Sequence, residues 1–90
     1  MAAQRRPLGA GNWKMNGLKP AAAELGKIVA GATGLPNVDL LVCPPATLVM
    51  MFASAAHGSK VAVGAQDCHA EPCGAFTGDI SAEIDRKSVV

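Results

Sequence analysis

The sequence predicts an α/β fold in which helices lie outside a parallel β-sheet. Short apolar segments alternate along the chain with segments whose apolar residues recur at helical spacing. One of the short segments, residues 38–43, is apolar almost throughout, which is typical of a strand buried on both faces of a parallel sheet. The order β-α-β-α-β-loop-α implies right-handed crossovers and therefore parallel strands.

Length and composition narrow the class of protein. Ninety residues are enough for one small domain, and 50% of them are hydrophobic while 17% are charged, which excludes an intrinsically disordered chain. The formal net charge of +1 carries no signal for nucleic acid or for anionic lipid. The longest mostly apolar stretch, residues 46–56, is shorter than the roughly 18 residues of a membrane span. We therefore expect neither nucleic acid nor a membrane as a partner.

The first strand and helix are predicted from propensity and periodicity. Residues 8–13 form the first strand, and Pro20 stands where a helix N1 proline belongs. Behind it an apolar stripe with the spacing i, i+3, i+4, i+7 predicts a helix. The stripe consists of Leu25, Ile28, Val29 and Ala32. Gly31 and Gly34 mark the end of this helix.

The second helix follows the strand at residues 38–43 and repeats the same spacing. Its stripe consists of Leu48, Met51, Phe52 and Ala55. Gly58 is suited to the C′ position after this helix, because glycine adopts a left-handed conformation without strain.

The last part of the chain contains a strand, a long loop and the start of a helix. The third strand is predicted at residues 61–65 and the irregular loop at residues 66–78. A final helix begins around Ile80, with Asp79 or Ser81 as its cap. Three parallel strands have two open edges, and two complete helices cannot cover both faces of their sheet. We therefore expect this chain to be the beginning of a larger α/β fold.

The end of the first strand carries the strongest candidates for chemistry. Functional groups of parallel α/β folds gather at the carboxyl ends of the strands, where Asn12 and Lys14 lie two residues apart. An extended backbone would place both side chains on one face. An amide donor and an ammonium group together suit a carbonyl or phosphate ligand. The alternative is that both residues belong to a solvated turn without a ligand.

The cysteines favour a reduced, intracellular protein. Cys43, Cys68 and Cys73 are odd in number and follow no secretory signal, so we expect free thiols and a cytoplasmic location. A zinc site at Cys68, His69 and Cys73 is not expected, because structural zinc takes four ligands in closely spaced pairs.

Three motifs in register carry a resemblance to a known family. They are GNWKMNG at residues 11–17, VCPPATL at residues 42–48 and VGAQDCHAEPCGAFTGDISAE at residues 63–83. In this order they resemble the first three strands of the triosephosphate isomerase family, together with the loops that follow them. The resemblance covers residues 8–83, which is most of the chain.

The resemblance implies a fold and an activity. The family folds as a (β/α)8 TIM barrel of about 250 residues, so residues 1–90 are expected to form a partial barrel domain with an incomplete third unit. It interconverts dihydroxyacetone phosphate and glyceraldehyde 3-phosphate through an enediolate, without a cofactor. Asn12 matches the family's substrate-binding asparagine, and Lys14 matches the catalytic lysine that binds the substrate and neutralises its charge. The tail at residues 84–90 does not follow the family's pattern.

The resemblance also implies a homodimer. In the family the third loop interlocks with the neighbouring subunit, and Met15 matches a residue that packs into the partner's third loop. Thr77 matches the threonine that braces the partner's first loop. Met15, Gln66 and Thr77 are therefore expected at the subunit interface.

The family's base and electrophilic histidine have no match in this chain. His57, His69 and Glu83 are expected to be surface or interface residues, and none is a credible base. The chain alone is therefore predicted to be inactive. One alternative is a non-enzymatic module that associates through its third loop and open sheet edges. Another is a small doubly wound phosphate-binding domain, although the glycine-rich fingerprint of that fold is missing.

Overall fold

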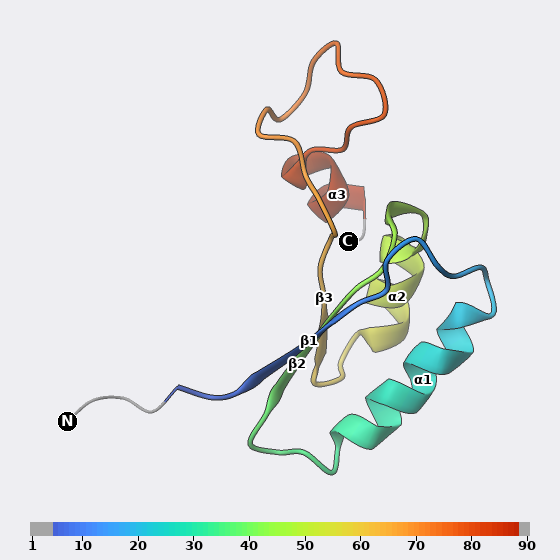
Figure 1. The fold of residues 1–90 in the computed structure, drawn as a ribbon, viewed down its shortest axis with the longest axis vertical. Coiled ribbons are helices and arrows are strands. Elements are labelled where there is room, and N and C mark those ends of the chain that lie inside the picture. Colours follow the sequence, from blue (N-terminus) through green and yellow to red (C-terminus); the bar gives the residue numbers. More distant parts are fainter. Residues whose placement is uncertain (1–4, 89–90) are drawn as a thin grey trace.

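The strands form one parallel sheet in the order β1-β2-β3 (Figure 1). A computed structural model describes residues 5–88, with β1 at Leu8–Asn12, β2 at Asp39–Cys43 and β3 at Val61–Val63. Asn12 pairs with Cys43, and Val42 pairs with Val63. The predicted strand order and the parallel pairing are confirmed, although β3 ends two residues earlier than predicted.

Helix α1 spans Ala21–Ala32 and packs through the predicted stripe. Leu25 and Ala32 are buried, and the two stripe residues between them are half-buried against the core. Pro20 has helical torsion angles but precedes the helix as its N-cap, so the predicted N1 position is wrong by one residue. Gly31 is the second-last residue of the helix and Gly34 follows its C-cap Thr33, so the predicted end of the helix is confirmed.

Helix α2 spans Val49–Ala56 and follows a 3₁₀ turn at residues 46–48. Leu48 and Phe52 face the core as predicted, but Ala55 is exposed and Ala56 is buried instead. The 3₁₀ turn has about 3.0 residues per turn rather than 3.6, so it shifts the phase of the stripe for the residues that follow it. Gly58 has a φ of +78°, which confirms its place after the helix.

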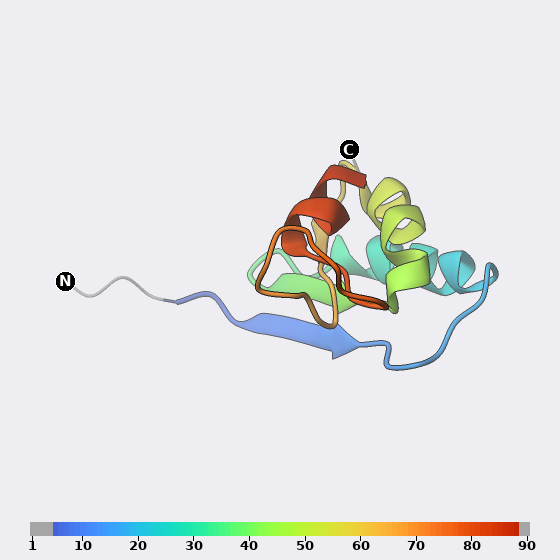
Figure 2. The same ribbon diagram turned by 90° about the horizontal axis from the view of Figure 1, so that it is seen from above.

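The helices α1 and α2 cover one face of the sheet (Figure 2). Strand β2 was expected to be buried on both faces, yet Val42 is its one buried residue. Strand β1 is exposed along its whole length. The expectation of burial on both faces is wrong because no element of the described part of the chain covers the opposite face.

The core lies between this covered face and the two helices. Leu25 and Phe52 have no exposed surface, and they pack with Val42 and Val61. The ring of Trp13 meets the ring of Phe52 edge to face, with 4.9 Å between the centroids and 85° between the planes. The residue that follows β1 is thus anchored in the core.

Helix α3 spans Ala82–Ser88 and ends the described part of the chain. The Ile84 N–H donates to Ser81 Oγ at 3.1 Å, so the cap is Ser81 and not Asp79. A single parallel bridge joins His69 to Ser81 and closes the long loop at its base. This loop projects beyond the sheet, at the end where β3 finishes (Figure 1).

Candidate active site

The carboxyl ends of the three strands form one continuous rim. The Trp13 N–H donates to the Cys43 carbonyl at 3.0 Å, and the Gly64 N–H donates to the Val42 carbonyl at 2.9 Å. These bonds extend the parallel pairing one residue beyond β1 and beyond β3. The segments that leave the strands therefore start side by side.

Two residues of the loop after β1 are of the type that its geometry requires. Asn16 Nδ2 donates to the Trp13 carbonyl at 3.1 Å and closes the turn. Gly17 has a φ of +110°, and a Cβ there would lie 2.7 Å from Leu48 Cδ1. This position favours glycine over every other residue, because a side chain would strain the backbone and would also clash with Leu48 in the core.

Lys14 has a left-handed backbone with a φ of 60°. For a residue with a Cβ this conformation costs about 1–2 kcal/mol. Two side chains hold it: the Lys14 N–H donates to Asn12 Oδ1 at 2.8 Å, and the Lys14 carbonyl accepts from Gln66 Nε2 at 2.8 Å. The extended backbone that we expected to place Asn12 and Lys14 on one face therefore ends at Asn12. The turn that follows sets the direction of the Lys14 side chain.

The bond to Lys14 also fixes the orientation of the Asn12 amide. Because Oδ1 accepts the Lys14 N–H, the amide must present Nδ2 as the group that can donate to a ligand. Both residues are exposed on the rim. An N–H donor beside an ammonium group suits an oxygen that carries, or develops, negative charge.

Gln66 joins all three strand ends with one amide group. It follows β3, and its Nε2 donates to the Lys14 carbonyl at 2.8 Å and to the Cys43 carbonyl at 3.0 Å. Sequence reasoning placed Gln66 at a subunit interface and missed these contacts within the chain. They join residues 52 and 23 positions apart, so no local spacing indicates them.

The third loop is organised by its own side chains. The rings of His69 and Phe76 stack with 3.9 Å between centroids and a tilt of 34°. His69 Nδ1 accepts the Glu71 N–H at 2.9 Å. Met15, on the first loop, has 94% of its surface exposed, and Thr77 is exposed as well.

Comparison with known proteins identifies the family of the chain that carries this rim. The sequence model of the triosephosphate isomerase family matches residues 7–88. The chain belongs to the triosephosphate isomerase family. The resemblance drawn from the three motifs is confirmed, and the match continues past Glu83 to the end of α3.

Curated relatives and a solved structure support the same assignment. Triosephosphate isomerase of Bradyrhizobium diazoefficiens is 62% identical over 80 residues, which cover 88% of this chain and 32% of the relative. That of Xanthobacter flavus is 52% identical over 86 residues, covering 96% and 34%. The crystal structure of triosephosphate isomerase from Bartonella henselae superposes with a TM-score of 0.87 at 39% identity, covering 93% of this chain and 35% of that one.

The chain spans about a third of the length of the triosephosphate isomerases that it matches. Its parallel strands and outer helices correspond to part of the TIM barrel, which confirms the predicted fold class. Walls of a substrate site that other strands of such a barrel build are therefore not among the residues described here.

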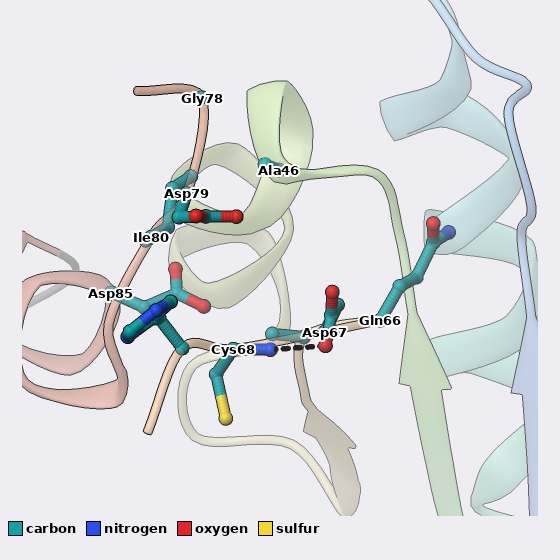
Figure 3. A pocket seen from close by; sticks show the side chains of 10 residues that line it. Ala46, Gln66, Asp67, Cys68, Gly78, Asp79, Ile80 and Asp85 are labelled. Atoms are coloured by element: carbon teal, nitrogen blue, oxygen red, sulfur yellow. Dashed lines mark hydrogen bonds between the residues drawn. The ribbon is translucent and has the colours of Figure 1, made fainter. Parts of the chain in front are cut away.

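A pocket of about 170 Å³ lies between the third loop and α3 (Figure 3). Asp67, Asp79 and Asp85 line it, and the Cys68 N–H donates to Asp67 Oδ1 at 2.9 Å. Its lining includes neither Asn12 nor Lys14. Three carboxylates are a poor environment for an anionic ligand, so we place the candidate site on the open rim instead.

The remaining candidate residues belong to the end of α2 and to α3. His57 is the exposed C-cap of α2, and Glu83 is exposed on α3. The three cysteines are free thiols, and no three His, Cys, Asp or Glu residues of the described part of the chain are arranged to hold a metal ion. None of the helices between residues 5 and 88 combines the length and the apolar character that crossing a membrane requires.

Proposed function

We propose that Asn12 and Lys14 are substrate-binding residues of a triosephosphate isomerase, which interconverts dihydroxyacetone phosphate and glyceraldehyde 3-phosphate through an enediolate. The observation that carries the proposal is the left-handed Lys14, held by Asn12 and Gln66 at the carboxyl end of β1 in a chain of this family. Asn12 Nδ2 donates to a substrate oxygen, and the Lys14 ammonium offsets the negative charge of the phosphate and of the enediolate.

The chain alone is proposed to be inactive. Removing a proton next to a carbonyl requires a base within hydrogen-bonding reach of that proton. His69 accepts a bond within its own loop, His57 is the C-cap of α2, and Glu83 lies on α3, and we expect none of them to act as the base. We propose that residues 1–90 form the first units of one barrel domain, which works in the cytoplasm without a cofactor or metal.

The complete protein is proposed to be a homodimer that forms through the third loop. Met15 on the first loop is 94% exposed and Phe76 on the third loop is 46% exposed, so each loop presents an apolar side chain that a partner subunit would cover. Met15 and Thr77 fit an interface in which the first loop of one subunit meets the third loop of the other, with Gln66 at the base of that loop.

A second candidate function is association without chemistry. Strands β1 and β3 each have one unpaired edge within the described sheet, and unpaired edges invite pairing with another chain. The two functions differ in whether Lys14 matters, because association through sheet edges does not need its ammonium group.

The test uses a chimera in which residues 7–88 replace the matching third of the Bradyrhizobium diazoefficiens enzyme. Lys14→Met is expected to lower kcat/KM by at least about 10²–10³-fold, because an apolar side chain of similar length cannot offset charge on the substrate. Lys27→Met is the matched control. Lys27 is exposed on α1, where it pairs with Glu24 at 3.4 Å, and its loss should leave kcat/KM unchanged.

Two results would contradict the proposal. One is a Lys14→Met chimera whose kcat/KM equals that of the parent chimera. The other is isomerase turnover by the isolated 90-residue chain above the rate of a free-lysine control.

A further inference from the structure

We propose that Gln66 is a positioning residue for catalysis, which acts by holding Lys14 in its left-handed conformation. The inference rests on the proposed function, because it concerns how the Lys14 ammonium is aimed at the substrate. Gln66 itself has no assigned contact with the substrate. Its role follows from the two carbonyl groups to which its amide nitrogen donates.

Both N–H groups of the Gln66 amide bond to the rim. A primary amide nitrogen has two N–H groups, and each finds one carbonyl oxygen, that of Lys14 at 2.8 Å and that of Cys43 at 3.0 Å. In Figure 3 the Gln66 side chain extends away from Asp67 and Cys68 and reaches toward β2 and β1. Gln66 contributes to the lining of the pocket, but its amide nitrogen donates its hydrogen bonds at the strand ends.

The second bond supplies a fixed reference for the first. The Cys43 carbonyl also accepts the Trp13 N–H at 3.0 Å, so it is held by the sheet on one side and by Gln66 on the other. Through Gln66, the Lys14 carbonyl is therefore tied to a rigid strand end and not to another mobile loop. A strained conformation persists only where its surroundings determine it in this way.

Loss of Gln66 removes one of the two groups that hold the Lys14 backbone. Asn12 still accepts the Lys14 N–H, but the Lys14 carbonyl is free to rotate, and φ can relax to a negative value. Such a rotation redirects the side chain, because Cβ moves with the backbone. A displacement of about 1 Å at a charged group that contacts the reacting centre is enough to cost about 10²-fold in rate.

The contact requires the shape and the donors of glutamine. Glutamate has the same length but offers oxygen atoms to two carbonyl oxygens, which repels instead of bonding. Methionine has a similar length and no donor at all. Gln66→Glu and Gln66→Met therefore remove the bonds without leaving a large cavity, and agreement between the two variants separates loss of the donors from the added charge.

The experiment uses the same chimera and measures kcat/KM and the melting temperature. Each Gln66 variant is expected to lose about 10²-fold in kcat/KM while its melting temperature stays within about 4 °C of the parent. The matched control is Thr33→Val, which removes another exposed side-chain bond, from Thr33 Oγ1 to the Ala30 carbonyl at 2.9 Å, at the far end of α1. The control should keep the kcat/KM of the parent.

A double-mutant cycle with Lys14→Arg separates positioning from a general structural role. Arginine keeps the positive charge but already displaces it, so Gln66→Glu should cost less than about threefold in that background. A loss that stays near 10²-fold in the Lys14→Arg background would overturn the positioning role. So would Gln66 variants whose kcat/KM lies within about threefold of the parent.

The same data distinguish failure of the inference from failure of the proposed function. If Lys14→Met abolishes turnover while the Gln66 variants keep the kcat/KM of the parent chimera, the inference alone is refuted. If Lys14→Met is as active as the parent, the proposed function is refuted together with the inference.

Discussion

At Lys14 two side chains hold a backbone conformation that is uncommon for a residue with a Cβ. Its φ of 60° is the one positive value recorded for a non-glycine residue in the described chain. Asn12 contributes twice, since its oxygen holds the Lys14 N–H and its nitrogen is thereby turned outward. The two residues predicted from the motif are thus linked by a hydrogen bond that the motif does not reveal.

The two roles of Asn12 can be separated by substitution. Asn12→Asp keeps an oxygen that accepts the Lys14 N–H, but it replaces the Nδ2 donor with a second oxygen. In the chimera we expect a melting temperature within about 4 °C of the parent and a kcat/KM lowered about 10²–10³-fold, because a ligand oxygen then meets a carboxylate.

Asn37→Asp is the matched control for this substitution. Asn37 is exposed in the connection between α1 and β2, far from the rim, so kcat/KM should not change. An Asn12→Asp variant that is as active as Asn37→Asp would show that Nδ2 does not bind the substrate.

At the scale of elements, the connection from β1 to α1 depends on particular residue types for its shape. Trp13 packs on Phe52, Asn16 closes the turn, and Gly17 passes against Leu48 where a side chain has no room. The loop therefore holds its shape through contacts with the core. The contact between Gly17 and Leu48 joins residues that are far apart in the chain, so no local sequence pattern predicts it.

Two glycine substitutions test this difference between elements. Gly17→Ala should destabilise the chimera by about 1–3 kcal/mol, because φ is +110° and Cβ would meet Leu48 Cδ1 at 2.7 Å. Gly26→Ala should stabilise it by about 0.5–1 kcal/mol, because this position lies within α1 and nothing lies within 4 Å of its Cβ.

Thermal unfolding measures both effects. A change of 1 kcal/mol in the free energy of unfolding corresponds to about 2–4 °C in the melting temperature of a chimera of about 250 residues. Equal melting temperatures for the two variants would contradict the assignment of Gly17 as a steric requirement.

The boundaries of elements show where local patterns stop being informative. The stripe of α1 was predicted correctly, since all four of its residues lie within one α-helix. The stripe of α2 slipped at Ala55 because a 3₁₀ turn precedes the helix, and apolar spacing does not distinguish the two kinds of turn. Of the two proposed caps of α3, the structure selected Ser81.

At the scale of the whole molecule, the sheet is covered on one face and open at two edges. This arrangement confirms the expectation that two helices cannot cover both faces. Leu8, at the start of the edge strand β1, is 61% exposed. The 90-residue chain by itself should therefore associate with other copies.

Sedimentation velocity of the isolated chain tests this expectation. At micromolar concentration we expect species heavier than the 9.1 kDa monomer. Leu8→Lys should shift the distribution toward the monomer, since a charge at an edge strand opposes pairing. Leu35→Lys, at a loop residue that is 48% exposed, should have no such effect. A well-folded monomer at these concentrations, or equal effects of the two variants, would refute the role of the edge.

The order of strands and helices, the long loop and the family could all be derived from the amino-acid sequence, because periodicity, turn residues and motifs are local properties of a chain. The left-handed Lys14, the direction of the Asn12 amide and the three-way contact of Gln66 could not. They depend on backbone groups that folding brings together from positions up to 52 residues apart. Because every residue has a backbone carbonyl, the sequence does not indicate which of them accepts a given hydrogen bond.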